Sequence, residues 1–316
     1  MQMNPLSSQY LGFSIASPIV VAACPLSTKL ENLERMQDAG AGAVVLFSLF
    51  EEGRRNNGEP DSQYRVSSDD YLRLVDDASS KLNIPVIASL NGTNLDHLSQ
   101  MTMLATNAGA HAVEYNPYHL PVDLTQSGRD IEEQLVELAT EMRAICQKPM
   151  ALKLMPTLSS PGNLALILDG IGVDGLVMFN RLYLPSVDTE NMNIHQSVQL
   201  SRKEDSQWSI HWASLLYGKI SSSIIGNSGI ENAEQALQYL LSGASSVQVA
   251  SCLIRNGIDY LKSLNQGLED WMNHHECDDI QSLVGLLTEQ RQADSHTLER
   301  LNYMKSLHNF QSPYFK

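Results

Sequence analysis

One turn recurs four times in this chain, and it constrains the fold more than any other feature. In each copy a glycine ends a helical pattern, a small or apolar residue follows, and a run of strand-forming residues begins. The four copies read DAGAGAVVLF (38–47), NAGAHAVEYN (107–116), GIGVDGLVMFN (170–180) and SGASSVQVAS (242–251). Glycine there fits the left-handed residue that follows a helix. The repeat therefore predicts a recurring helix–strand unit.

Eight nearly continuous apolar runs fit strands that are buried on both faces. They cover residues 18–23, 43–48, 85–91, 112–116, 149–155, 175–180, 222–228 and 246–251. Between them, amphipathic helical patterns occupy residues 30–39, 95–108, 130–145 and 233–242. Eight strand–helix units in succession predict an α/β fold of the (β/α)8 TIM-barrel type. A doubly wound open sheet is the alternative, weakened because no Gly-x-Gly-x-x-Gly turn follows the first strand.

The chain of 316 residues is short enough to form one barrel domain. Its last part, about 279–309, contains one or two helical patterns that we expect outside the barrel and in a packing role. We therefore expect a single barrel domain over 1–316, with a C-terminal helical extension from about 279 to 316.

Composition excludes several classes of function. The net charge of −15 argues against binding to nucleic acid or to an anionic membrane surface. The four cysteines are far apart and form no Cys-x-x-Cys pair, so neither an iron–sulfur cluster nor another metal site is expected. The first residues do not resemble a signal peptide, and no apolar run approaches membrane-spanning length. These features favour the reducing cytoplasm.

Polar residues collect where the strands end. Strands three, four, six and seven run into Asn91, Asn116, Asn180 and Asn227. A single asparagine there is more often a turn residue. Four in one ring would offer donors and acceptors to the edge of a flat, neutral heterocycle. The long polar stretches 51–68 and 181–208 leave the same ends, the face on which barrel enzymes carry their sites.

Lys153 lies in an otherwise apolar strand, where an unpaired charge is costly. It is expected to pair with a carboxylate such as Glu114, to stand beside a bound anion, or to act as a Schiff-base amine. The small residues of 224–230 and 250–257 fit a phosphate cradle after strands seven and eight.

In this order and spacing, seven segments resemble the dihydroorotate dehydrogenase family of flavin barrels over about residues 10–275. They are ASPIVVAACP, IASLNGTN, VEYN, MALKLMP, DGLVMFN, SIIGNSGI and VQVAS. SLFEE after strand two and Asn-Pro-Tyr after strand four add to the likeness. The resemblance implies FMN as cofactor and oxidation of dihydroorotate to orotate in pyrimidine biosynthesis, or of a related dihydropyrimidine-like substrate, by hydride transfer to flavin.

The resemblance also implies roles for individual residues. Lys153 would face the pyrimidine edge of the flavin, where a cation favours the anionic reduced form. The implied substrate contacts are Asn91, Asn116 and Asn180, and Arg181 is a further candidate because it directly follows strand six. The implied flavin and phosphate contacts are Ala22, Ala23, Ser48, Asn91, Asn116, Lys153, Gly226, Asn227, Ser228, Gly229, Ala250 and Ser251.

Two positions depart from the family pattern. The usual Cys or Ser base falls on His119, and a Lys expected after strand two is Phe47. An imidazole can accept a proton near neutral pH, so His119 is the first candidate base and Tyr118 the second. A surface histidine explains His119 equally well. Arg54 and Arg55 are, with Arg181, the further cations that could meet a substrate carboxylate.

Three functions stay open at this point. The first is the flavin-dependent dehydrogenase, with a small-molecule substrate, a soluble electron acceptor or partner redox protein, and a homodimer as one expected assembly. The second is a flavin barrel that has lost this reaction and serves in electron transfer or regulation. The third is a barrel aldolase or isomerase that uses Lys153 without flavin.

Overall fold

The computed structural model describes residues 4–51, 66–195, 198–288 and 295–310, with side chains omitted at 295–299. Its core is a parallel sheet in the order β4-β3-β13-β12-β9-β8-β7-β6, and β4 also pairs with β6. That last pairing closes the sheet, so the predicted (β/α)8 barrel is confirmed and the open-sheet alternative is wrong. The strands are β3 (Ile19–Val21), β4 (Ala43–Val45), β6 (Val86–Asn91), β7 (Ala112–Asn116), β8 (Met150–Leu154), β9 (Gly175–Met178), β12 (Ser223–Asn227) and β13 (Ser246–Val249).

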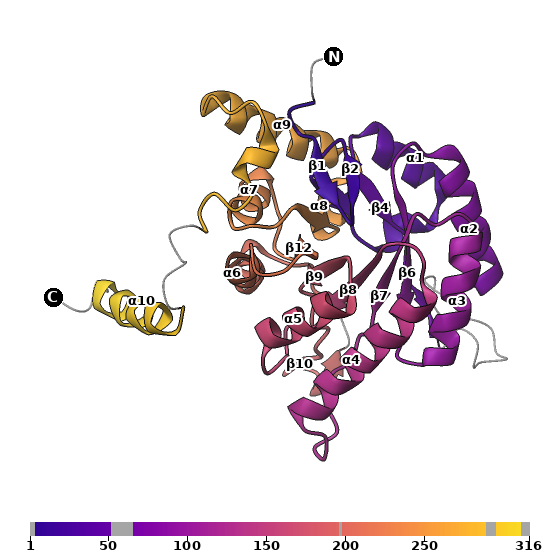
Figure 1. The fold of residues 1–316 in the computed structure, drawn as a ribbon, viewed down its shortest axis with the longest axis horizontal. Helices are drawn as coiled ribbons and strands as arrows, with labels where there is room; N and C mark the ends of the chain where they lie inside the picture. Colours follow the sequence, from indigo (N-terminus) through magenta and orange to yellow (C-terminus); the bar gives the residue numbers. More distant parts are fainter. Residues whose placement is uncertain (1–3, 52–65, 196–197, 289–294, 311–316) are drawn as a thin grey trace.

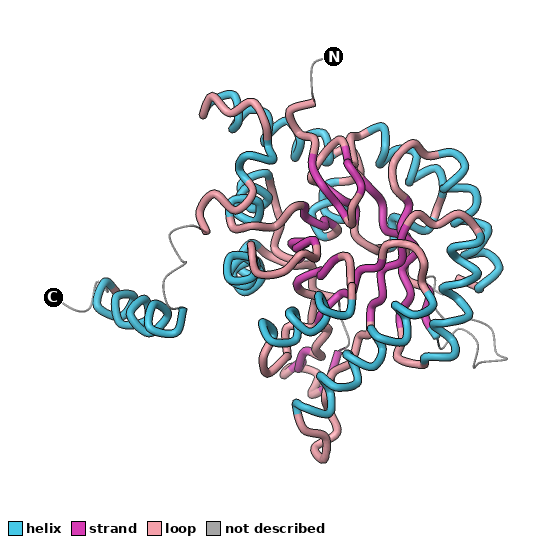
Figure 2. The backbone as a smooth tube through the Cα atoms, in the orientation of Figure 1, coloured by secondary structure: helices cyan, strands magenta, loops and turns pink. Residues whose placement is uncertain are grey.

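Helices surround the barrel, as Figures 1 and 2 show. The glycines of the four repeated turns, Gly40, Gly109, Gly172 and Gly243, have φ of 91°, 101°, 95° and 104°. They adopt the left-handed conformation that the sequence repeat predicted. The helices are α1 (Leu30–Asp38), α2 (Ser68–Lys81), α3 (Leu95–Asn107), α4 (Gly128–Ile145), α5 (Pro161–Ile171), α6 (Gln207–Leu216), α7 (Ala233–Leu241), α8 (Ser251–Asn256) and α9 (Tyr260–His274).

A hairpin that the sequence patterns did not predict packs into the barrel interior. β1 (Ser8–Tyr10) and β2 (Phe13–Ile15) pair antiparallel across Leu11 and Gly12, both of which have positive φ. Two such residues form the turn that suits a tight hairpin. Tyr10 and Leu11 pack with the inward-facing strand residues of the barrel. Three-residue strands carry too little periodicity to be recognised from sequence.

The long stretch 181–208 also contains more structure than its polar composition indicated. A second hairpin joins β10 (Ser186–Asp188) to β11 (Asn193–His195). The Asp188 carboxylate accepts the backbone N–H groups of Glu190 at 3.0 Å and Asn191 at 3.1 Å, and this local bonding closes the turn. The 3-10 turn η3 (Lys203–Ser206) then leads into α6.

The C-terminal extension divides into two parts. The 3-10 turn η4 (Ile280–Leu283) packs on the barrel, where Ile280 is buried and its N–H donates to the Pro5 carbonyl at 2.9 Å. Helix α10 (Ser295–Asn309) stands apart from the barrel in Figure 1. Two short elements complete the described chain, the turn η1 (Pro25–Thr28) and the strand β5 (Leu49–Phe50), which pairs with β6.

Gly175 gives the first prediction, because the first hairpin fits only where β9 starts without a side chain. A Cβ at Gly175 would lie 2.2 Å from Leu11 Cδ2. We expect Gly175→Ala to lower the free energy of unfolding by about 1–3 kcal/mol, the usual cost of an overpacked core. Urea denaturation measures the change.

Gly170→Ala is the matched control, because nothing lies within 4 Å of a Cβ at that helical position. It should raise the free energy of unfolding by about 0.5–1 kcal/mol through helix propensity alone. Equal effects at the two glycines would show that the hairpin does not depend on the space at Gly175.

Candidate active site

The described residues of the predicted site all lie at one end of the barrel. Ala22, Ala23, Ser48, Asn91, Asn116, Lys153, Asn180, Arg181, Gly226, Asn227, Ser228, Gly229, Ala250 and Ser251 stand at or just beyond the C-terminal ends of strands, and Tyr118 and His119 follow β7. Parallel closure places these ends around one opening, here called the barrel mouth. Arg54 and Arg55 lie outside the described residues.

Two of the four asparagines at the mouth are hydrogen-bonded to each other, and a third bonds to the backbone. Asn180 Nδ2 donates to Asn116 Oδ1 at 2.7 Å, so the amides of β7 and the segment after β9 are joined directly. Asn180 Oδ1 accepts the Arg181 N–H at 2.9 Å. Asn227 Nδ2 instead donates to the Phe179 carbonyl at 2.6 Å. Asn116 and Asn180 thus form a fixed amide pair, while Asn227 holds the backbone beside it.

Lys153 belongs to a buried polar cluster. Its Nζ lies 3.3 Å from Gln248 Oε1 and 3.9 Å from Glu114 Oε1, so the expected pairing with Glu114 is present. Gln248 Nε2 donates to Glu114 Oε2 at 2.5 Å. The Lys153 side chain is 7% exposed and that of Glu114 is 0% exposed. Because buried charges are tolerated only when paired, Glu114 is the group that lets a cation reach the mouth.

The expected phosphate cradle follows β12. Ser228 and Gly229 have φ of 76° and 71°, and two successive left-handed residues turn the backbone sharply at the strand end. The Tyr239 hydroxyl contacts the carbonyls of Asn227 at 2.9 Å and Ser228 at 2.8 Å, which fixes this turn.

Close packing around this cradle leaves no room for a side chain at its two glycines. A Cβ at Gly226 would lie 2.4 Å from Tyr239, and one at Gly229 would lie 2.4 Å from the Ser206 nitrogen. After the neighbouring strand β13, the Ser251 hydroxyl is bonded to the N–H and the hydroxyl of Ser201, each at 3.0 Å.

The two candidate bases differ in how they are held. The Tyr118 hydroxyl accepts the Tyr183 N–H at 2.9 Å, and the two rings lie 5.7 Å apart. His119 Nε2 is buried and has no hydrogen-bond partner among the described residues. Tyr118 therefore ties two loops together, whereas His119 carries an unused ring nitrogen.

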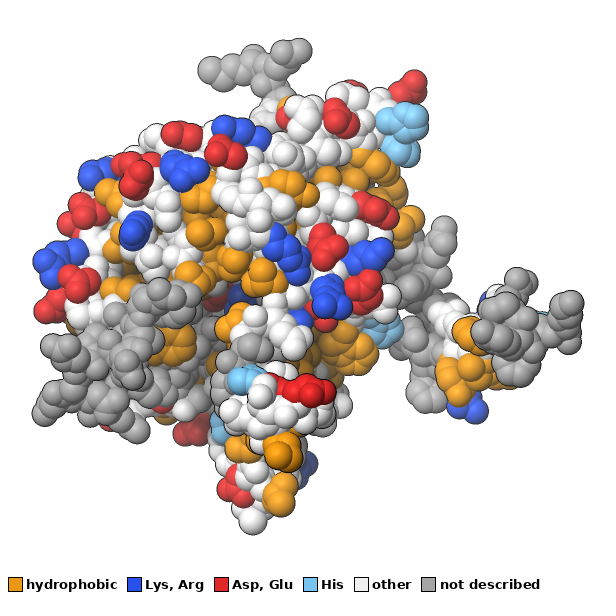
Figure 3. Space-filling model, turned by 180° about the vertical axis from the view of Figure 1, so that it is seen from behind, with side chains coloured by type: hydrophobic (Ala, Val, Ile, Leu, Met, Phe, Trp, Pro, Cys, Tyr) orange, Lys and Arg blue, Asp and Glu red, His pale blue; other side chains and the backbone are white. Residues whose placement is uncertain are grey.

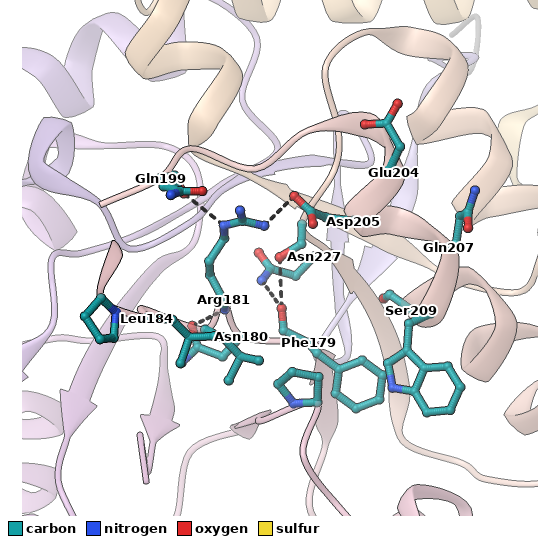
Figure 4. Close-up of a pocket in the computed structure, with 15 residues that line it drawn as sticks. Phe179, Asn180, Arg181, Leu184, Gln199, Glu204, Asp205, Gln207, Ser209 and Asn227 are labelled. Carbon is teal, nitrogen blue, oxygen red and sulfur yellow. Dashed lines mark hydrogen bonds and ion pairs between the residues drawn. The ribbon is translucent and has the colours of Figure 1, made fainter. Parts of the chain in front are cut away.

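A cavity of about 650 Å³ opens at the β9 and β12 side of the mouth (Figure 4). Arg181 lines it, but its guanidinium forms a very short contact with Asp205 and donates to the Gln199 carbonyl at 2.9 Å. Asn180, Asn227 and Ser228 line it too, and Trp208 and Leu184 add apolar surface. These contacts hold the Arg181 guanidinium at the wall of the cavity.

The opposite side of the mouth, after β4, carries Phe47 at the position where the resemblance implied a lysine. The Phe47 ring lies 5.9 Å from that of Phe50. Next to it, the Ser48 hydroxyl is hydrogen-bonded to Ser89 at 2.8 Å. Phe47 is thus a half-buried aromatic residue that packs against Phe50.

Several residues of the site were missed in the sequence. Gln248 is a lone polar residue in a valine-rich strand, the same signal that singled out Lys153. Tyr10, Ser201 and Asp205 contact residues that are distant in the chain, so no local sequence pattern could predict these contacts.

Three further findings concern metals, surface charge and membrane-spanning helices. Among the described residues, no group of three or more His, Cys, Asp or Glu side chains could hold a metal ion. On the face seen in Figure 3, described Lys and Arg side chains are scattered among acidic ones. No helix in the described part of the chain has the length and apolar character of a membrane span.

Comparison with known proteins gives consistent matches. The family model described as dihydroorotate dehydrogenase matches residues 65–272. Relatives named dihydroorotate dehydrogenase B (NAD(+)), catalytic subunit, come from Methanosarcina acetivorans and Thermoplasma volcanium. The first is 24% identical over 87% of this chain and 94% of its own length. The second is 22% identical over 90% of this chain and 99% of its own length.

The cysteines give the second prediction. Burial raises the pKa of the Cys24 and Cys146 thiols and raises the pKa of Cys252 to about 12, whereas Cys277 is half exposed. Because the thiolate is the reactive form, we expect Ellman's reagent at pH 8 to react rapidly with one thiol per chain. Cys277→Ser should remove that phase. A fast reaction at Cys24 would contradict this and would place a usable thiolate base near the mouth.

Proposed function

Since this chain belongs to the dihydroorotate dehydrogenase family, we propose that it is an FMN-dependent oxidoreductase that oxidises dihydroorotate, or a related dihydropyrimidine, at a carbon–carbon single bond. One observation carries the proposal. A paired lysine reaches the barrel mouth beside the amide pair Asn116–Asn180. A cation with neutral amides suits a flat heterocycle that becomes anionic when it is reduced.

The residues present fit FMN. Lys153 would face the edge of the ring on which negative charge develops, and Ala22 and Ala23 leave the end of β3 without bulk. The turn at Ser228 and Gly229 would hold the phosphate through backbone N–H groups, with Ala250 and Ser251 on the other side. FMN, when bound, supplies the hydride acceptor.

The substrate contacts come from the amides. Asn91, Asn116 and Asn180 would hydrogen-bond the pyrimidine edge, and the Asn116–Asn180 bond holds two of these amides in place before substrate arrives. Arg181 would meet the substrate carboxylate in exchange for Asp205. This exchange costs less than burying a new cation, since one ion pair replaces another.

His119 would take the proton that leaves with the hydride. Its Nε2 is buried and has no hydrogen-bond partner in the described part of the chain, so no hydrogen-bond donor there would compete with the substrate for this nitrogen. Tyr118 would hold the loop through its contact with Tyr183.

Reoxidation would pass to a soluble acceptor or to a partner redox protein, in the cytoplasm. The relatives are named catalytic subunits, which favours a partner protein. A homodimer is compatible with such an assembly.

A second candidate function is a flavin protein without dihydroorotate chemistry, favoured by Phe47 at the position of a family lysine. A Schiff-base role for Lys153 has less support, because its Nζ is held by Gln248 and Glu114 within the buried cluster.

The visible spectrum gives the third prediction. The purified protein, reconstituted with FMN if necessary, should show flavin absorbance that bleaches when dihydroorotate is added without oxygen. Protein that binds no FMN would refute the proposal. Bound flavin that dihydroorotate does not reduce would favour the second candidate function.

His119 gives the fourth prediction. His119→Asn should slow flavin reduction by about 10²–10⁴-fold, the usual contribution of a general base. Stopped-flow bleaching measures the rate, and FMN affinity should not change. Tyr118→Phe is the control and should keep most of the rate. The reverse ranking would make Tyr118 the base.

A further inference from the structure

The polar cluster beneath the mouth joins four elements of the barrel. Tyr10 comes from β1, Glu114 from β7, Lys153 from β8 and Gln248 from β13, and all four are buried. Gln248 is within hydrogen-bonding distance of the other three: Tyr10 at 3.3 Å, Glu114 at 2.5 Å and Lys153 at 3.3 Å. The proposed function uses Lys153 and leaves the role of Gln248 unexplained.

We propose that Gln248 is a positioning residue that holds the Lys153 ammonium at the mouth, and that Tyr10 of the N-terminal hairpin fixes the Gln248 amide. The role of the held ammonium beside a flavin rests on the proposed function. The positioning itself does not depend on it, and the experiment below separates the two.

The amide of Gln248 can satisfy its neighbours in one orientation. A carboxylate only accepts hydrogen bonds and an ammonium only donates them. Nε2 must therefore face Glu114, which leaves Oε1 for Lys153. The Tyr10 hydroxyl faces the same Nε2 at 3.3 Å. Burial and the nearby Glu114 raise the pKa of Tyr10 well above its usual value, so this group stays a neutral hydroxyl that can accept the bond.

Glu114 alone does not hold Lys153. Its Oε1 has no hydrogen-bond partner in the described part of the chain, and 3.9 Å is too long for a hydrogen bond to Lys153. Glu114 pairs in the sheet with Ala151, two positions before Lys153 on β8, and so lies deeper in the barrel. Among the described residues, Gln248 Oε1 is the acceptor within hydrogen-bonding distance of Nζ.

Few other titratable groups act on this cluster. Among the described residues, Tyr71 of α2 feels the charge of Glu114, and Cys24 after β3 feels that of Lys153. Burial raises the pKa of both, so both are neutral near pH 8 and do not replace Gln248.

The fifth prediction uses the reactivity of the amine. The full-length protein is pulsed at pH 8 with formaldehyde and a borane reductant, and mass spectrometry compares methylation of Lys153 with that of exposed Lys219. Only the neutral amine reacts. Gln248→Met removes the acceptor of the ammonium, so we expect relative labelling of Lys153 to rise about tenfold. Tyr10→Phe should give a smaller rise of about twofold, because Glu114 still holds the amide.

Tyr71→Phe is the matched control. It also removes one buried tyrosine hydroxyl, but that hydroxyl contacts the backbone of Ser89 rather than Gln248. Unchanged or slower labelling in Gln248→Met would overturn the proposal, because Glu114 would then hold Lys153 by itself. If Gln248→Met does not fold, equal labelling of Tyr10→Phe and Tyr71→Phe overturns the part assigned to Tyr10.

Added FMN separates this inference from the proposed function. Bound flavin should protect Lys153 from methylation in the wild-type protein. A Gln248 effect without protection by FMN would uphold the positioning role and count against the cofactor. If FMN protects Lys153 from methylation but Gln248→Met does not change its labelling, the cofactor is supported and the positioning role of Gln248 is overturned.

Discussion

Pairing of β4 with both β3 and β6 closes the sheet, and every residue of the candidate site owes its place to that closure. Eight parallel strands bring eight carboxyl ends to one opening, whereas an open sheet would spread them along an edge. Closure also creates an interior without water, which the side chains must fill. Closure of the sheet therefore determines both the packed core and the position of the candidate site.

The interior is filled in two layers of different character. Towards the amino ends of the strands, Leu11 of the first hairpin packs among apolar residues such as Val20 and Ile87. Towards the mouth, the apolar filling gives way to Glu114, Gln248 and Lys153. Tyr10 belongs to both layers, with its ring in the apolar part and its hydroxyl beside Gln248. A hairpin that closes one end of the barrel thus touches the polar groups that serve the other end.

The sequence predicted what depends on local pattern. The repeated glycine turns located helix–strand boundaries, since a left-handed residue there strongly favours glycine. Strand 112–116 agrees with β7 at both ends, and the lone Lys153 pointed to a buried pair with Glu114. The first hairpin could not be predicted in this way, because its strands are stabilised by the barrel that they enter. The Arg181–Asp205 pair was likewise hidden, since it joins residues 24 positions apart across an irregular segment.

The departures from the family pattern change how many cations are available at the barrel mouth. Phe47 puts an aromatic ring where the family has a lysine, and Arg181 is neutralised by Asp205. Among the described residues at the strand ends, Lys153 then remains as the buried cation, with its Nζ 3.3 Å from Gln248 Oε1 and 3.9 Å from Glu114 Oε1. In a water-poor mouth, a single charge acts more strongly than in solvent. A site with fewer cations can therefore still favour the anionic reduced ring of the proposed flavin, provided that Lys153 is held at the opening.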